Sequence, residues 1–174
     1  MKTTIRKGVF ETNSSSSHVL VIPRNSERKE SKTDLEKLDW TIKLTSDNTW
    51  EASIMGSGDH CYDVRDKLVY IWTAICSGIE LGETWAYEAA DTLQKVVPNV
   101  KLVRPKDKAF AKDKLNWINH QSAEVCGLKK IFGFYDEELK YKLLRDLLLH
   151  GTIFLNYEEN RMEYDGTYDI VWEM

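Results

Sequence analysis

The residues of this chain best suited to chemistry form a run of hydroxyl side chains that ends in an imidazole. The run reads Thr12, Asn13, Ser14, Ser15, Ser16, Ser17 and His18. A tight loop of small residues exposes backbone N–H groups in one concavity, and serine hydroxyls add rotatable donors. Together these groups suit the oxygens of a phosphate, sulfate or carboxylate. The run therefore predicts an anion-binding loop, although a solvated serine-rich turn has the same composition.

A second polar cluster, His120, Gln121 and Ser122, lies in the other half of the chain. Two imidazoles that titrate near neutral pH can move protons, and amide and hydroxyl groups can orient a phosphate or an attacked carbonyl. If the two clusters converge on one pocket, the candidate catalytic residues are His18, His120 and Ser122. Gln121 would then bind the ligand. The alternative is that His120 supports a short helix beside Trp117.

Parts of both clusters resemble a set of uncharacterised phage and bacterial proteins. Arg6 and the string VFETNSSSSH at 9–18 are similar to the opening of those proteins. Their second half tends to carry Asp-His-Gln-Ser, and the similar residues here are Asn119, His120, Gln121 and Ser122. Asn119 replaces the aspartate and removes its charge. The resemblance implies a phage or mobile-element origin and a shared ligand site that includes Arg6, but no reaction type.

Composition is that of an ordinary globular protein and limits its partners. The 174 residues are 42% hydrophobic and 30% charged, with a formal net charge of −4. These values exclude global disorder and strong nonspecific binding to nucleic acid. Three cysteines without a CxxC pair favour a reducing compartment, and no signal peptide or membrane-spanning run is recognisable. We therefore expect a cytoplasmic protein, in the host cytoplasm if phage-encoded, with no membrane partner.

Other chemical signals are weaker. Five residues are of the types that bind zinc: His18, His60, Cys61, His120 and Cys126. Their positions lack CxxC, HxxxH or HExxH spacing, so no metal site is predicted and any cofactor stays unidentified. His60 and Cys61 instead suggest the start of a helix capped by Asp59. No phosphate-binding P-loop or dinucleotide fingerprint is present. The basic stretch 101–114 could follow a nucleic-acid backbone, but such a run is more often a solvated face.

The strands that must position these residues are predicted from hydrophobic alternation. Residues 18–23 are apolar on both faces and should form an internal strand, preceded by a strand within 2–10. The polar stretch 24–39 should be a mobile loop or a short exposed helix. A hairpin is expected from 40–44 and 50–54. Further strands are expected at 100–103, 152–157 and 167–172, the last two joined through an acidic turn region.

Three helices are predicted from apolar stripes and end signals. The first spans about 62–76 and is stopped by Ser77 and Gly78. The second spans 84–97 with Thr84 as its N-cap. The third spans 136–150, with Asp136 as its N-cap and Gly151 past its end. Residues 115–126 are ambiguous between helix and loop. The sequence thus predicts a single α+β domain over 1–174, with an antiparallel or mixed sheet containing both termini, packed by about three helices.

The favoured function is binding of a phosphate-bearing ligand, such as a nucleotide or a nucleic-acid end. The serine run would hold the phosphate, and Arg6, Thr12, Asn13 and Gln121 would add contacts. Whether the ligand is then hydrolysed or transferred stays open, and so does whether the protein is an enzyme. The alternative is a non-enzymatic phage protein that inhibits a host defence factor through a protein surface.

Overall fold

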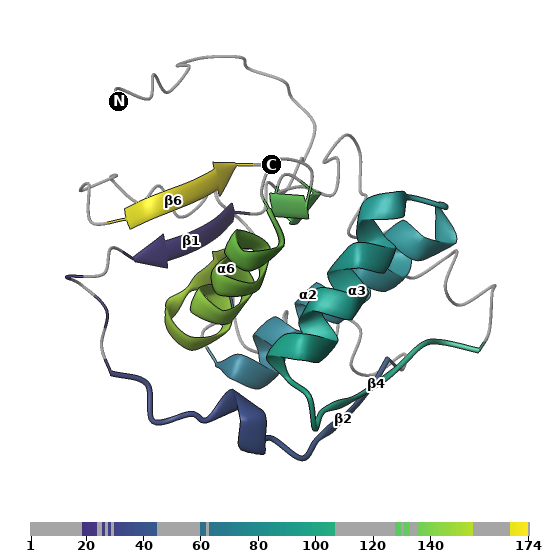
Figure 1. The fold of residues 1–174 in the computed structure, drawn as a ribbon, viewed down its shortest axis with the longest axis horizontal. Helices are drawn as coiled ribbons and strands as arrows, with labels where there is room; N and C mark the ends of the chain where they lie inside the picture. The colour runs from purple at the N-terminus through teal and green to yellow at the C-terminus, as the bar shows by residue number, and fades with distance from the viewer. Residues whose placement is uncertain are drawn as a thin grey trace.

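The computed structural model describes residues 19–23, 26, 28, 30–44, 60–61, 63–106, 128–129, 131–132, 136–154 and 168–173. Within this part of the chain, three long helices pack together, and α6 (Glu137–His150) lies between the other two and a four-stranded antiparallel sheet (Figure 1). A separate two-stranded parallel sheet lies beyond the helices. The fold is therefore α+β, as the sequence predicts.

The central helix, α2 (Val64–Glu80), begins close to the predicted position. The Asp63 carboxylate caps it by accepting a hydrogen bond from the backbone N–H of Asp66 at 2.8 Å. Every residue from Lys67 to Ile79 is buried, so the helix is covered on all sides and not along one stripe. Between Lys67 and Glu80 the sequence carries no charge, which is the pattern of a fully buried helix.

The predicted end of this helix at 77–78 is wrong, because α2 continues to Glu80. Gly78 lies where α2 crosses α3 (Thr84–Val96), and a Cβ atom added to it would stand 2.7 Å from the Cβ of Ala86. Glycine is therefore required there for close packing of two helices. The turn between them uses Gly82 instead, whose φ of +74° is a conformation that glycine adopts readily.

The two remaining helices match their predicted spans, with one correction at a cap. Thr84 is the first residue of α3 and not its N-cap; Glu83 holds the N-cap position without a side-chain capping bond. The third helix, α6 (Glu137–His150), begins as predicted, since the Asp136 carboxylate accepts from the backbone N–H of Leu139 at 2.9 Å.

The four-stranded sheet has the order β3-β5-β1-β6, with each neighbouring pair antiparallel. Its strands are β1 (Val19–Pro23), β3 (His60–Cys61), β5 (Thr152–Phe154) and β6 (Tyr168–Glu173). The prediction that β1 is internal is confirmed. β1 separates β5 from β6, so these two do not pair with each other. The strand expected within 2–10 lies outside the described residues.

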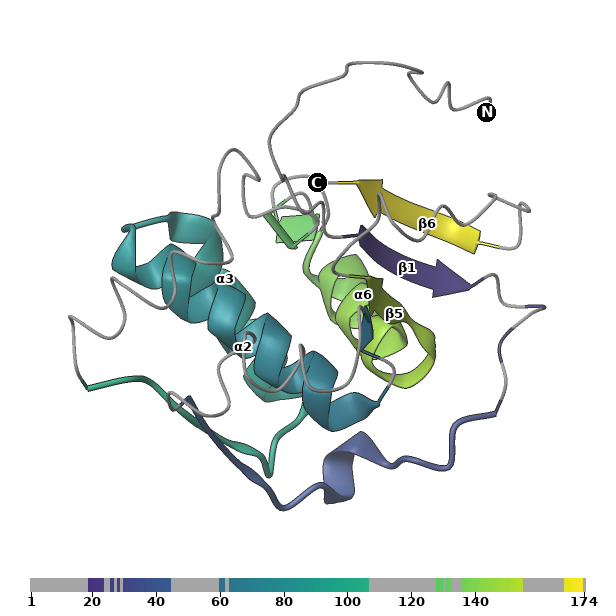
Figure 2. The ribbon, with the colours of Figure 1, turned by 180° about the vertical axis from the view of Figure 1, so that it is seen from behind.

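The prediction of a helix start at His60 and Cys61 is wrong. These residues form β3, which pairs with β5, and the helix begins only at Val64 with Asp63 as its cap. Two residues are too few for a periodicity signal, so the pairing depends on the tertiary fold. Figure 2 shows β5 beside β1, with α6 packed against them.

The smaller sheet pairs strands far apart in the sequence. β2 (Thr41–Lys43) lies parallel to β4 (Lys101–Val103), with Ile42 opposite Leu102. The predicted hairpin partner at 50–54 lies outside the described residues. The indole N–H of Trp72 donates to the carbonyl oxygen of Val103 at 3.1 Å and attaches this sheet to α2.

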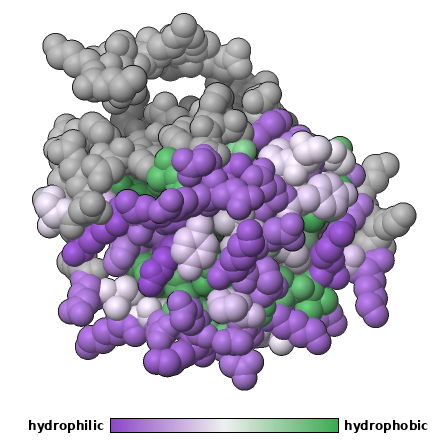
Figure 3. Space-filling view, viewed as in Figure 1, coloured by the Kyte–Doolittle hydropathy of each residue, from purple (hydrophilic) through white to green (hydrophobic). Residues whose placement is uncertain are grey.

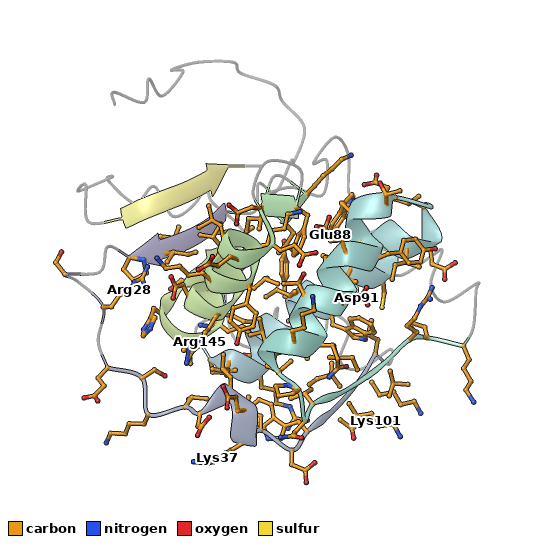
Figure 4. The ribbon with its side chains drawn as sticks, in the orientation of Figure 1. Arg28, Lys37, Glu88, Asp91, Lys101 and Arg145 are labelled. Carbon is orange, nitrogen blue, oxygen red and sulfur yellow. The ribbon has the colours of Figure 1, made fainter. Side chains whose placement is uncertain are left out.

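The polar stretch after β1 contains a 3-10 helix, η2 (Leu35–Lys37), and is attached to the body at several points. Leu35 is buried in the core. The Arg28 guanidinium lies 3.0 Å from the Asp146 carboxylate on α6, and its Nε donates to the carbonyl oxygen of Pro23 at 3.0 Å. Figure 4 shows Arg28 beside α6, with Lys37 on the short helix further along.

Candidate functional site

The residues that the sequence selects as a site lie outside the described part of the chain. They are Arg6, Thr12, Asn13, Ser14, Ser15, Ser16, Ser17, His18, His120, Gln121 and Ser122. The structure does describe the element that follows each cluster. β1 begins one residue after His18, and the first residue described after the second cluster is Leu128, which is helical and lies six positions after Ser122. These two elements define where each cluster attaches to the fold.

The serine run attaches to an internal strand of the sheet. β1 is hydrogen-bonded to β5 on one side and to β6 on the other. Leu20 and Ile22 are 1% exposed and Val21 is 5% exposed, so both faces of the strand are covered. A strand paired on both sides and buried on both faces is among the most stable parts of a protein. The preceding segment therefore has a rigid point of attachment.

Strand pairing aligns four residues across one end of the sheet. Val19 pairs with Phe154 on one side and with Glu173 on the other, and Phe154 pairs in turn with His60. We call these residues the end row. Since neighbouring strands lie about 4.8 Å apart, Val19 is about one strand spacing from Glu173 and about 10 Å from His60. In the next row, Leu20 and Ile153 are buried in the core.

The end row was missed by sequence reasoning. The sequence offers His60 as a weak zinc-ligand candidate and as the start of a predicted helix, and neither role relates it to the other members of the row. Forty-two positions separate His60 from His18 in the sequence, and no motif relates them. Their relation depends on β3, which the sequence does not reveal as a strand.

The second cluster precedes a well-packed helical segment, residues 128–129 and 131–132, which we call the anchor segment. Leu128, Ile131 and Phe132 are at most 4% exposed. The Lys129 ammonium group lies 3.3 Å from the Glu83 carboxylate at the start of α3. Figures 1 and 2 show the anchor segment, the unlabelled green turn, at the same end of the molecule as the start of β1 and the end of β6.

A charged pair beside the anchor segment joins α3 to α6. Lys140 is only 8% exposed; its ammonium group contacts the Glu88 carboxylate and lies 5.8 Å from the centre of the Phe132 ring. Figure 4 shows Glu88 on the side of α3 that faces α6. Because a buried ammonium group needs such partners, this pair explains how α6 tolerates a lysine in its core stripe.

The described residues include one buried cysteine, whose surroundings suit a structural role. Cys76 is buried in α2, and burial raises the pKa of its thiol to about 12. A thiol with so high a pKa is inert as a nucleophile. Within the described ranges, no cluster of three or more histidine, cysteine or acidic residues could hold a metal ion.

The outer surface of the helices is hydrophilic. Figure 3 shows polar side chains covering most of the face formed by α3 and α6. No helix in the described part of the chain is both long and apolar enough to cross a lipid bilayer.

Comparisons with protein families, with curated proteins and with solved structures give no significant match.

Proposed function

We propose that the protein binds a phosphate-bearing ligand, a nucleotide or a nucleic-acid end, through the serine run 14–17. The observation that carries this proposal is the direct connection of the run to β1. A loop that binds an anion through backbone N–H groups must hold its donors in place before the ligand arrives, because ordering them on binding costs affinity. A strand that is paired on both sides and buried at Leu20, Val21 and Ile22 supplies that support.

The second cluster belongs to the same site in this proposal. Ser122 is six positions before Leu128 in the sequence, and six residues of chain span at most about 20 Å when fully extended. The anchor segment stands at the same end of the molecule as the start of β1. Gln121 can then donate to the ligand together with Arg6, Thr12 and Asn13. His18 and His120 can transfer protons if the bound phosphate ester is hydrolysed or transferred, with Ser122 beside them.

A thermal-shift experiment tests this proposal. The purified protein is screened against inorganic phosphate, AMP, ATP and 5′-phosphorylated oligothymidylate. A ligand at a hundred times its dissociation constant stabilises the fold by about 2.7 kcal/mol, or roughly 5–10 °C for a chain of this size. We expect one of these probes to shift the parent but not a triple variant, Ser14→Ala, Ser15→Ala and Ser16→Ala.

The matched control carries Ser26→Ala and Ser31→Ala, two serines in the stretch that follows β1. It should retain the full shift, because it removes hydroxyls without touching the serine run. A parent protein that none of the probes shifts contradicts the proposal. A shift that survives in the triple variant contradicts the assignment of the ligand to the serines.

A second candidate function is binding to a host protein in the cytoplasm. It is favoured by Leu81 and Tyr87, which are 52% and 51% exposed on the hairpin of α2 and α3. A contiguous exposed apolar patch marks an interaction site in soluble proteins, and these two are the large hydrophobic side chains found exposed in the described part of the chain. The test is capture of a partner from host lysate. This function is supported if the parent and the triple serine variant both capture the partner and a variant with Leu81→Ser and Tyr87→Ser does not. Equal capture by both variants would exclude this surface.

A further inference from the structure

We propose that the outer face of the two-stranded sheet binds the phosphate backbone of a single-stranded nucleic acid. Four exposed cationic side chains lie on this face and on the chain that leaves it, and we call them the cationic strip: Lys43, Lys101, Arg104 and Lys106. All four belong to the described part of the chain. The proposal is independent of the serine run and concerns a separate surface.

The pairing of β2 with β4 explains why the cations point outward. Ile42 is 1% exposed in the core, and its partner Leu102 packs against the same core, so these two residues mark the inner face of the sheet. Because side chains alternate between the two faces of a strand, Lys43 and Lys101 belong to the outer face, where both are exposed. Lys101 pairs with Thr41, so the Cα atoms of the two lysines stand about 8 Å apart on neighbouring strands.

The chain after β4 continues the row of charges. Arg104 and Lys106 follow the strand directly and are exposed, and five residues of extended chain span at most about 17 Å. Lys101, Arg104 and Lys106 therefore follow one another along a narrow line, as the phosphates of an extended strand do. The hydrogen bond from the indole N–H of Trp72 to the carbonyl oxygen of Val103 holds this line against α2. Figure 4 shows Lys101 at the periphery of the molecule, on β4.

One carboxylate contacts the strip within the described residues. Glu80, at the end of α2, lies 3.7 Å from the Arg104 guanidinium, and the two side chains are 38% and 50% exposed. A pair so open to solvent is weak, so a phosphate can replace the carboxylate. Among the described residues, neither Lys101 nor Lys106 makes an ion pair. The strip therefore keeps a local positive charge in a chain whose net charge is −4.

The groups beside the cations favour nucleic acid over an acidic peptide. Val103 is half-buried on the outer face between Lys101 and Arg104. Before β2, the Arg65 guanidinium lies 6.0 Å from the centre of the half-buried Trp40 ring. Bases stack on aromatic rings and guanidinium planes, and a single strand exposes its bases for such contacts whereas a duplex does not. An acidic peptide has carboxylates for the lysines but no flat ring for these groups.

Acidic residues limit the strip at the start of β2. Asp39 precedes Trp40, and Asp63 and Asp66 flank Arg65 in the sequence. These carboxylates repel a phosphate backbone, so we expect the strand to follow Lys101, Arg104 and Lys106 and to extend away from the first turn of α2. Four phosphate contacts to a single strand give a slope of about −3 for log K against log[salt]. Binding should therefore be weak at physiological salt, with a dissociation constant of about 10⁻⁴–10⁻⁶ M.

Fluorescence anisotropy of the full chain with a labelled oligothymidylate of about 15 nucleotides tests the proposal. The probe carries no terminal phosphate, so it offers no phosphate end to the serine run. In a strip variant with Lys101→Gln, Arg104→Gln and Lys106→Gln, affinity at low salt should fall roughly 10- to 100-fold. The slope against log[salt] should become shallower by about 2, because three phosphate contacts are lost.

The matched control carries Lys32→Gln, Lys95→Gln and Lys142→Gln. These three lysines are exposed after β1, on α3 and on α6, so the control changes the net charge as much as the strip variant does. It should keep the slope of the parent. Equal weakening in the control and in the strip variant overturns the proposal, because net charge alone then accounts for the effect.

The melting temperature of each variant is measured without the oligonucleotide. If the strip variant melts below the parent, a double variant with Lys101→Gln and Lys106→Gln decides, since it leaves the contact of Arg104 with Glu80 in place. Its slope should be shallower than that of the parent by about 1.4. An unchanged slope in the double variant overturns the proposal.

The remaining outcomes separate the strip from other sites and other partners. The triple serine variant should bind the probe as the parent does; a loss of binding there assigns the oligonucleotide to the serine run and overturns the strip. Displacement of the probe by polyglutamate as readily as by unlabelled oligothymidylate of equal charge identifies an acidic protein as the partner and overturns nucleic acid. Tighter binding of a duplex of equal length overturns the single strand. A parent that binds no probe at low salt overturns the proposal and leaves the phosphate site untouched.

Discussion

The ammonium nitrogen of Lys67 lies 2.9 Å from the carbonyl oxygen of Gly151, so a side chain from the first turn of α2 donates a hydrogen bond to the C-cap residue of α6. The same nitrogen donates to the carbonyl oxygen of Leu147 at 3.0 Å, and the residue is 1% exposed. The last carbonyl groups of a helix lack partners within the helix and carry the negative end of its dipole. A buried cation satisfies both needs and ties α2 to the start of β5.

Replacing Lys67 should therefore destabilise the fold. Lys67→Met keeps much of the aliphatic volume but removes the lysine donor from the carbonyl oxygens of Gly151 and Leu147, of which the second still accepts from the backbone N–H of Gly151. The loss should cost about 1–3 kcal/mol. Lys67→Ala adds a cavity and should cost more. Urea denaturation measures both, with Lys142→Ala on the exposed side of α6 as a control expected to change stability by about 0.5 kcal/mol or less. A Lys67→Met variant as stable as the parent would show that these hydrogen bonds add nothing net.

Gly78→Ala should destabilise the protein although alanine favours a helix by about 1 kcal/mol over glycine. The new methyl group would stand 2.7 Å from the Cβ of Ala86 and 2.8 Å from Cζ2 of Trp85, so α2 and α3 must move apart. Overpacking of this kind costs typically 1–3 kcal/mol. The melting temperature should fall, and Gly78→Ser should lower it further. A rise in melting temperature for Gly78→Ala would refute the close crossing.

The elements predicted well are those whose signals are local. For α6, the cap at Asp136, the leucine stripe and Gly151 all agree, and the helix follows them. β1 is recognised because Leu20, Val21 and Ile22 are all apolar, as an internal strand requires. In each case neighbouring residues alone determine the structure.

The features that escaped prediction depend on distant partners. Gly78 looks like a helix end until Ala86 is placed against it, and Lys67 looks like a surface residue until α6 supplies its acceptors. The pairing of β2 with β4 joins residues such as Ile42 and Leu102, sixty positions apart. His60 shares this property, because its place in the end row exists only once β5 lies between β3 and β1.

The contribution of Cys76 to the free energy of unfolding should fall at alkaline pH. Burial raises the pKa of its thiol to about 12, above the ordinary value of 9.0. Above pH 9 the unfolded thiol loses its proton while the folded one keeps it, so this group's contribution is complete below pH 9 and declines as pH rises toward 12. The decline approaches about 1.4 kcal/mol per pH unit.

The measurement is urea denaturation of the parent and of Cys76→Ala at pH 7.5, 9.5 and 10.5. Cys76→Ala removes this titration while the other two cysteines and the tyrosines remain, so the difference in unfolding free energy between the two proteins isolates Cys76. That difference should shrink between pH 9.5 and 10.5. A constant difference would contradict burial of the thiol.

Glu173→Gln should tighten phosphate binding, because it removes a negative charge from the residue that pairs with Val19. Glu173 is one strand spacing from Val19 in the end row, so its carboxylate charge acts on an anion held before β1. Two unit charges about 10 Å apart in water interact by about 0.4 kcal/mol, and a phosphate carries up to twice the charge, so affinity should rise about two- to fourfold.

Isothermal titration with ATP at low and high salt measures this effect, and Asp91→Asn on the exposed side of α3, labelled in Figure 4, is the control. The gain in Glu173→Gln should disappear at high salt, because dissolved ions screen the repulsion between the two charges. Weaker binding in Glu173→Gln at both salt concentrations would instead show that the carboxylate holds a donor of the site in place. Equal gains in Glu173→Gln and Asp91→Asn would trace the effect to net charge and not to the end row.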